Sequence, residues 1–307
     1  MRRAPALAVA AAASAALLLS ACSGLVDPLG PPSGSGAPGG AAGVVVGSGT
    51  STESTVVAAL YARALTAKGV TASTRLALGN REAYLAALVD GSVSLVPEHT
   101  GSLLLHYDDT NPATTAAEVQ AALPEVLPAG VVLGKPSAAR DQAVYVVTRQ
   151  FSRAHRVTSL ADLAAVPGRP VLGGPTGLPT QPYGPEGLRQ VYGARLGAFR
   201  PDDSPAQRSR DLDAGRIGVA GFSSTEPVIA DKGYVVLGDP QAMIRPQNLV
   251  PLMRSTVAAD PAVVQAVDGV QAALTTAELS RLDEAVDVGG QAPDVVAGRW
   301  LSSKGLA

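Results

Sequence analysis

The fold is decided by residues 44–97, which read VVVGSGTSTESTVVAALYARALTAKGVTASTRLALGNREAYLAALVDGSVSLVP. The β-branched run at 44–46 predicts a short buried strand, because such side chains pack well in a covered sheet. Apolar residues then recur at helical spacing over 53–68, which predicts a helix that Ser51 or Thr52 can cap. A strand, a helix and a third strand are expected at 71–78, 80–90 and 92–97. This βαβαβ order predicts an open α/β sheet.

The same alternation recurs in the second half of the chain. Strands are expected over 143–148, 169–173, 217–221, 234–237 and 249–253, with helices over 159–165, 187–192 and 209–214. Three further helices are expected over 261–273, 276–286 and 293–302. The part from residue 44 to residue 307 is too long for one small core and suits two lobes of roughly 100–150 residues each.

The first 21 residues have the pattern of a secretion signal. Arg2 and Arg3 precede an almost unbroken run of Ala, Val and Leu over 6–19, which is shorter than a membrane span of about 20 residues. The run ends in Leu19-Ser20-Ala21-Cys22, which matches the bacterial lipoprotein box, so Cys22 is expected to carry a lipid anchor. The alternative is a signal in which the cysteine falls by chance. Cys22 is the only cysteine of the chain, which excludes an internal disulfide.

Residues 22–43 are expected to form a flexible linker that follows the lipidated cysteine. Gly, Pro, Ser and Ala dominate this stretch, and such a composition buries too little apolar surface to fold. The net charge of the whole chain is −2, from 24 basic and 26 acidic residues. This balance argues against nucleic acid as a partner, because nucleic-acid binding needs a basic face.

Enzyme machinery is scarce in this sequence. Of the three histidines, His155 is expected in a solvated turn, and the spacing of His99 and His106 matches no metal template. The stretch Gly221-Phe222-Ser223-Ser224 lacks the second glycine of a nucleophile elbow. We therefore expect no catalytic residues, no metal and no cofactor.

The glycine-rich loop at residues 47–52 has two interpretations. It contains no lysine for a phosphate-binding loop and lacks the spacing of a dinucleotide site. A tight turn from strand to helix explains it without a ligand. Equally, the N–H groups at a helix start can bind a polar ligand at the carboxyl end of a strand. The residues alone leave both interpretations open.

Several segments together resemble the osmoprotectant-binding component of ABC importers, the ProX-like family that takes glycine betaine, carnitine or choline. The matching segments run through most of the folded chain: Gly47-Ser48-Gly49-Thr50-Ser51-Thr52-Glu53, Leu78-Gly79-Asn80-Arg81-Glu82, Pro97-Glu98-His99-Thr100-Gly101, Gly173-Gly174-Pro175, Pro179-Thr180-Gln181-Pro182, Phe222-Ser223-Ser224-Thr225, Pro246-Gln247-Asn248, Leu274-Thr275-Thr276-Ala277-Glu278-Leu279 and Ala297-Gly298-Arg299-Trp300-Leu301. Each motif is weak alone, and their order and spacing carry the resemblance.

The resemblance implies a two-lobed periplasmic-binding-protein fold of type II, in which the chain crosses between the lobes twice. Lobe I would combine residues 44–142 with 247–307, and lobe II would be 143–246. A small solute would bind between the lobes and pass to a membrane permease driven by an ATPase. The chain would act as a monomer, without catalysis, at the outer face of the membrane. The alternatives are a ligand-sensing receptor domain without a transport role and an exported enzyme.

The same resemblance indicates where the solute binds and where this chain departs from the family. The family holds a quaternary ammonium among aromatic rings by cation–π attraction. Here His99 replaces a tyrosine of the family motif, Ser51 replaces a phenylalanine and Gln181 replaces an arginine. We therefore expect a more polar cleft, for an osmoprotectant or for a more polar or aromatic solute. The expected ligand-binding residues are Ser51, Thr52, His99, Thr100, Gln142, Tyr183, Phe222, Ser223 and Ser224.

Overall fold

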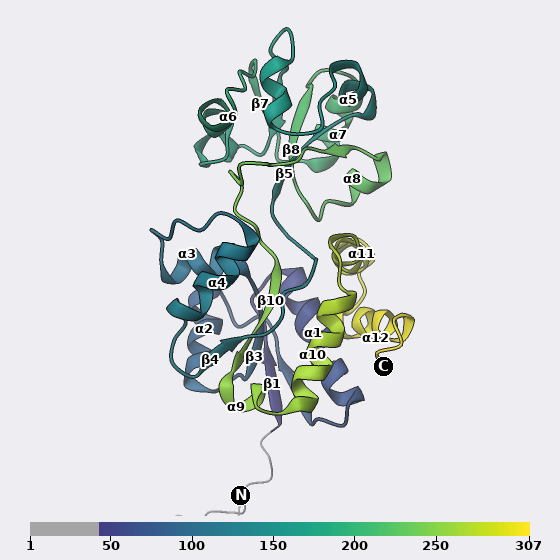
Figure 1. Ribbon diagram of the computed structural model, residues 1–307. Helices are drawn as coiled ribbons and strands as arrows, with labels where there is room; N and C mark the ends of the chain where they lie inside the picture. The colour runs from purple at the N-terminus through teal and green to yellow at the C-terminus, as the bar shows by residue number, and fades with distance from the viewer. Residues whose placement is uncertain (1–42) are drawn as a thin grey trace, which may run out of the picture. The chain divides into compact units, whose positions relative to one another are not determined.

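The computed structural model describes residues 43–307, so the predicted signal, Cys22 and nearly all of the linker lie outside the described residues. Within the described residues the chain forms two five-stranded sheets, each covered by helices (Figure 1). We call the part built on the first sheet lobe I and the part built on the second sheet lobe II. No helix within residues 43–307 is long and apolar enough to cross a membrane.

The sheet of lobe I has the strand order β2-β1-β3-β10-β4. Its strands are β1 Val44–Gly47, β2 Ala72–Arg75, β3 Leu95–His99, β4 Val131–Leu133 and β10 Leu249–Arg254. Strand β1 is parallel to β2 and β3, whereas β10 is antiparallel to β3 and β4. The carboxyl ends of β1, β2 and β3 therefore share one edge of the sheet, where β10 begins.

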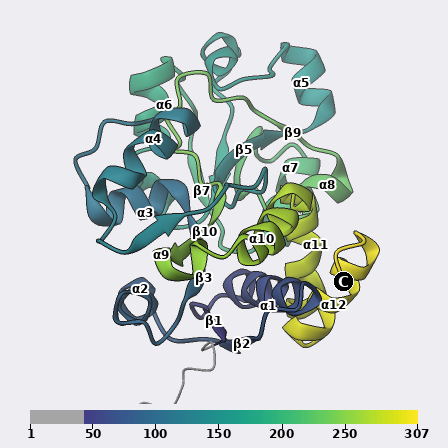
Figure 2. The same ribbon diagram turned by 60° about the horizontal axis from the view of Figure 1, so that its bottom comes forward.

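Alternation along β1 distributes its side chains between two cores. Val44 and Val46 join one apolar cluster, and Val45 packs against the other, because successive side chains of a strand point to opposite faces. One face is covered by α1 Thr52–Ala67, α10 Pro261–Ala273, α11 Thr276–Asp287 and α12 Pro293–Ser303, and α1 contacts the other three helices (Figure 2). The other face is covered by α2 Arg81–Asp90, α3 Thr100–Tyr107 and α4 Ala116–Val126. The short helix α9 Ser255–Ala258 links β10 to α10.

The sheet of lobe II has the strand order β7-β6-β8-β5-β9. Its strands are β5 Ala143–Val147, β6 Leu172–Gly174, β7 Phe199–Pro201, β8 Val219–Ser223 and β9 Val235–Val236. Its helices are α5 Arg149–His155, η1 Ala161–Ala165, η2 Leu178–Thr180, α6 Pro185–Tyr192, α7 Pro205–Asp213 and α8 Pro227–Lys232. Packing is close at the end of β6, because a Cβ on Gly174 would lie 2.5 Å from Leu178 Cδ2, and the leucine side chain would have to shift.

Two crossings connect the sheets, one between β4 and β5 and one between β9 and β10. The crossings are joined side by side, since Arg140 and Asn248 form an antiparallel bridge. The buried Asn248 side chain donates through Nδ2 to the carbonyl oxygen of Ser137 at 2.9 Å, and its backbone N–H donates to Thr100 Oγ1 at 3.2 Å. The predicted α/β fold of two lobes with two crossings is thus confirmed.

Several local predictions differ from the structure. The second strand ends at Arg75, two residues before Ala77, which has a positive φ of 55°. His155 is the last residue of helix α5, where we expected a turn. The helix expected at 159–165 is a 3₁₀-helix, Ala161–Ala165. The sequence did not predict helices α3, α4, α5, α8, α9 and η2, nor strands β4 and β7.

Candidate ligand-binding site

Lobe I is hollowed at the edge where its parallel strands end. The hollow has a volume of about 270 Å³. Its lining comes from the loop after β1, the starts of α1 and α2, the end of β3 and the first residue of β10: Gly49, Thr50, Ser51, Glu53, Ser54, Gly79, Asn80, Arg81, Tyr84, Pro97, His99 and Leu249. We call it the lobe I hollow. Ser51 caps α1 by accepting a hydrogen bond from the Ser54 N–H at 3.2 Å.

A carboxylate beneath the lobe I hollow organises three neighbours. Glu98 is 1% exposed and accepts from Arg81 Nε at 2.9 Å, from the Tyr84 hydroxyl at 2.6 Å and from the His99 N–H at 2.8 Å. A second guanidinium N–H of Arg81 reaches the other carboxylate oxygen at 3.3 Å. Burial lowers the pKa of Arg81, but the charge and hydrogen bond of Glu98, together with Tyr84, outweigh burial and raise that pKa. Arg81 therefore stays charged, and two of its guanidinium nitrogens are bound to Glu98.

A second carboxylate, Glu53, faces His99 across the lobe I hollow. His99 Nε2 lies 2.8 Å from Glu53 Oε1, which is an ion-pair distance, although the two atoms are not aligned for a hydrogen bond. Glu53 is 8% exposed and its Oε2 has no hydrogen-bond partner. Burial would lower the pKa of His99, but the neighbouring Glu53 raises it above its ordinary value. The pair can therefore hold a proton on the imidazole near neutral pH.

Further acidic groups lie near this pair. Thr52 Oγ1 donates to Asp287 Oδ1 at 2.5 Å, which joins the start of α1 to the end of α11. Asp283 lies one turn earlier in α11, and its Oδ1 is buried without a partner. Burial, together with the charges of Glu53, Asp141 and Asp287, raises the pKa of Asp283 to about 8, and His99 opposes this shift. Like charges in a poorly solvated place cannot all ionise together.

Lobe II has a corresponding hollow at the edge where β6 and β8 end and β5 begins. Its volume is about 410 Å³. Its lining residues are Asp141, Gln142, Ala143, Val144, Tyr145, Pro175, Gly177, Leu178, Gln181, Tyr183, Gly221, Phe222 and Ser223. We call it the lobe II hollow. Its single charged lining residue among the described residues is Asp141, which accepts hydrogen bonds from the hydroxyls of Ser223 and Thr225.

Three rings line the lobe II hollow, and two of them are already engaged. The Tyr145 hydroxyl donates to the carbonyl oxygen of Tyr183 at 2.5 Å, which fixes the loop between η2 and α6. The Phe222 ring lies under the guanidinium of Arg208, 4.8 Å from its carbon to the ring centroid. Both Tyr145 and Phe222 are buried, whereas Tyr183 is partly exposed.

The nine expected ligand-binding residues divide into two groups. Six line a hollow: Ser51 and His99 in lobe I, and Gln142, Tyr183, Phe222 and Ser223 in lobe II. The other three, Thr52, Thr100 and Ser224, line neither hollow; Thr52 binds Asp287, and the other two stabilise the crossings.

Sequence reasoning missed the charged members of the site, Glu53, Arg81 and Asp141. Each belongs to, or lies beside, a segment that we had singled out, but a carboxylate or guanidinium there gives no local sign of its partner. Within residues 43–307 no group of three or more His, Cys, Asp or Glu side chains is placed to hold a metal.

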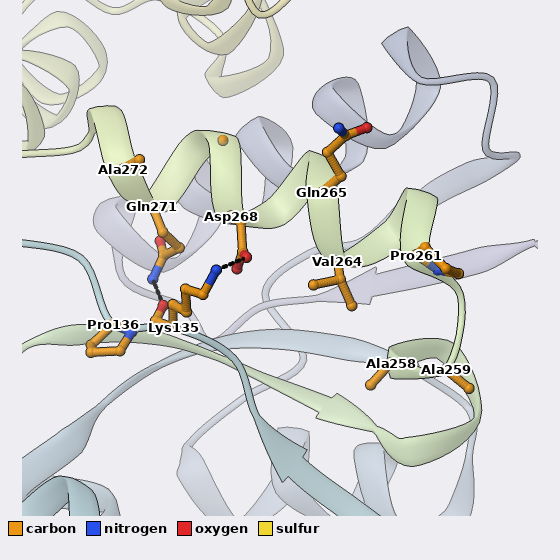
Figure 3. Close-up of a pocket in the computed structure, with 11 residues that line it drawn as sticks. Lys135, Pro136, Ala258, Ala259, Pro261, Val264, Gln265, Asp268, Gln271 and Ala272 are labelled. Atoms are coloured by element: carbon orange, nitrogen blue, oxygen red, sulfur yellow. Dashed lines mark hydrogen bonds and ion pairs between the residues drawn. The ribbon is translucent and has the colours of Figure 1, made fainter.

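A larger hollow, of about 750 Å³, runs along α10 (Figure 3). Small side chains of α9 and α10 line it together with Lys135 and Pro136, and Lys135 Nζ donates to Asp268 at 2.6 Å across it. Its lining comes from α9, from the flank of α10 and from Lys135 and Pro136, and includes no residue from the edge where β1, β2 and β3 end. Ligands of open α/β sheets lie at that edge, so the two smaller hollows form the candidate site.

Known proteins share this architecture. A glycine betaine/carnitine/choline ABC transporter structure superposes with a TM-score of 0.76 at 18% identity, over 86% of this chain and 99% of that one. Apo YehZ from Escherichia coli superposes with a TM-score of 0.74 at 22% identity, over 87% and 100% of the two chains. These likenesses confirm the type II binding-protein fold.

The sequence itself also matches known proteins. The glycine betaine-binding protein YehZ of Escherichia coli strain K12 is 23% identical over 277 residues, which cover 85% of this chain and 90% of YehZ. Residues 42–303 match the OpuAC family, described as the substrate binding domain of ABC-type glycine betaine transport systems. Because this match spans far more than half of the chain, the chain belongs to the OpuAC family of ABC transporter substrate-binding proteins.

Proposed function

We propose that this chain is the extracytoplasmic solute-binding lipoprotein of an ABC importer, and that it binds one small solute between its lobes. The observation that carries the proposal is the pair of hollows. Each lies at the edge of its own sheet where the parallel strands end, and the crossing residues Asp141 and Gln142 line the lobe II hollow. A solute held by both hollows would contact both lobes at once.

Solute binding would favour a closed arrangement of the lobes. A ligand shifts an equilibrium between two arrangements only when it binds one of them more tightly. The crossings run over residues 134–142 and 237–248, and the Arg140–Asn248 bridge joins them. They suit a hinge at which a few residues absorb the motion. We place the lobe boundaries at these crossings, with lobe I as 44–142 plus 247–307 and lobe II as 143–246. The closed form would then deliver the solute to the permease.

A lipid on Cys22 would keep the solute-binding protein near its permease. Cleavage after Ala21 would leave Cys22 as the first residue, followed by a spacer to residue 43. Tethering by such a spacer raises the effective concentration of the binding protein at the permease. One chain supplies both hollows of the proposed solute site, so we propose that the protein acts as a monomer.

Solute uptake tests this function. A strain that lacks the gene should lose high-affinity uptake of the solute, and the wild-type gene should restore it. A Cys22→Ala protein should bind the solute normally in solution but restore uptake only weakly, because it has no lipid anchor. Unchanged uptake of every solute that the purified protein binds would instead indicate a sensor without a transport role.

A further inference from the structure

We propose that the solute is a small organic cation that presents N–H donors and carries no carboxylate. This inference rests on the proposed function and concerns the charge pattern of the two hollows. Glycine betaine has the opposite character, because its ammonium has no N–H and it carries a carboxylate. The inference therefore separates this chain from the solute named in its family's description.

Each cation that lines a hollow already faces a carboxylate of the protein. Arg81 is held by both oxygens of Glu98, at 2.9 and 3.3 Å, and Glu98 is buried. His99 faces Glu53 at 2.8 Å. No basic residue is among the described residues that line the lobe II hollow, whereas Asp141 is. A carboxylate placed between the lobes would leave water without a counter-charge, which is costly.

The hollows do offer acceptors to a cation. Glu53 lines the lobe I hollow at 8% exposure, and its Oε2 accepts no hydrogen bond. A buried acceptor left without a donor costs about 1–3 kcal/mol, and more when it is charged. Because Oε2 is itself shielded from solvent, an ammonium in the hollow would reach it through a bridging water or after a turn of the Glu53 side chain, and would neutralise its charge. A quaternary ammonium can supply the charge but not the hydrogen bond.

An aromatic cage for a quaternary ammonium lacks exposed rings. Cation–π binding requires ring faces that the ligand can reach. Among the rings that line the hollows, Tyr84, Tyr145 and Phe222 are at most 9% exposed. Phe222 already carries the Arg208 guanidinium at 4.8 Å. Tyr183 is the partly exposed ring of this set, and one ring does not enclose an ammonium.

The acidic groups around the lobe I hollow also favour a cationic solute. The lobe I hollow and its border hold Glu53, Asp283 and Asp287, and the crossing adds Asp141. The basic groups among them are His99, which faces Glu53, and Arg81, which is paired with Glu98. The mutual repulsion of the acidic groups contributes to the raised pKa of Asp283. A bound cation would relieve this repulsion, so binding should release a fraction of a proton near pH 7.

The test uses two ladders of amines on the mature protein. The first ladder is ethanolamine with one, two and three N-methyl groups, ending in choline; the second compares agmatine with arginine and cadaverine with lysine. Titration calorimetry should show affinity that falls about 10- to 100-fold as N–H groups are replaced or a carboxylate is added. Repeating the titration in buffers of different ionisation enthalpy should reveal proton release.

Two variants locate the effect. Glu53→Gln should remove most of the discrimination along the methylation ladder, whereas Glu82→Gln, an exposed acid of α2 with no ion pair among the described residues, should leave it unchanged. Tighter binding of choline than of ethanolamine, tighter binding of an amino acid than of its amine, or no binding along either ladder would each overturn the inference. The uptake experiment decides the proposed function separately, since a transported betaine would support that function and contradict this inference.

Discussion

The two hollows are built from different chemistry. In lobe I, charges come in opposed pairs, Arg81 with Glu98 and Glu53 with His99. In lobe II, the lining combines rings, amides and a serine hydroxyl with small and aliphatic residues, and Asp141 is its one charged member among the described residues. Lobe I therefore has the means to select the charge of a solute, and lobe II has the means to select its shape. Substitutions in lobe I should therefore change the preference for solute charge, and substitutions in lobe II that add no charge should change the affinity for solutes of every charge.

The largest effect on stability is expected at Glu98, which binds Arg81, Tyr84 and His99 of the lobe I hollow. Glu98→Gln removes the charge that holds Arg81 and leaves the Tyr84 hydroxyl with a poorer partner. Breaking a buried pair from one side leaves an uncompensated charge, so the free energy of unfolding should fall by about 4 kcal/mol. Urea unfolding followed by circular dichroism measures it. Glu82→Gln, in the same helix as Arg81, is the control; an equal loss in both variants would show that Glu98 has no special role.

The sequence marked the segment that contains Glu98 but did not indicate that Glu98 binds Arg81 and Tyr84. The order of strands and helices followed from apolar periodicity, because each element buries a face of its own. The segment at 97–101 stood out by its resemblance to a family motif. Its ion pair joins residues 17 apart, and the Thr52–Asp287 contact joins residues 235 apart. Such pairs depend on the register of strands and on helix packing, which local patterns do not encode.

The second effect concerns Asp283, which lies beside the charged groups of the lobe I hollow and should make the stability of the protein depend on pH. Its pKa is raised from 3.8 to about 8, so the folded protein binds this proton more tightly than the unfolded chain. Stability from this group is therefore lost as pH rises from about 4 to about 8. Asp283→Asn should stabilise the protein at pH 9 by on the order of 3 kcal/mol and change little at pH 4.

Thermal unfolding at several pH values measures the Asp283 effect. His99, whose pKa is also raised, loses its contribution in the same direction, so the informative quantity is the difference between variant and wild type. Glu284→Gln, at the next position of α11, is the matched control because Glu284 is exposed. A parallel pH dependence in Asp283→Asn and wild type would show that Asp283 ionises normally.

A smaller effect is expected on the lobe II side, at Tyr145. Tyr145→Phe removes the hydroxyl that donates to the Tyr183 carbonyl oxygen at 2.5 Å and keeps the ring in place. One neutral hydrogen bond contributes about 1 kcal/mol to stability. Without this bond the loop that carries Tyr183 should become more mobile. Affinity should then fall by a similar factor for every solute, because the loop contributes to the shape of the hollow and adds no charge to it. If this variant instead changed the preference between an amine and the matching amino acid, lobe II would also select solute charge, which contradicts the prediction.

The smallest effect on stability is expected at Gln181, an exposed residue of the lobe II hollow. Surface substitutions usually change stability by less than about 0.5 kcal/mol. Gln181→Arg would add the cation that this hollow lacks, so affinity for carboxylate-bearing solutes should rise about tenfold while affinity for simple amines falls. Gln181→Lys tests whether charge alone suffices, since lysine lacks the bidentate geometry of arginine. If both variants leave the preference unchanged, the discrimination lies wholly in the lobe I pairs, and the charge pattern of lobe II has no part in it.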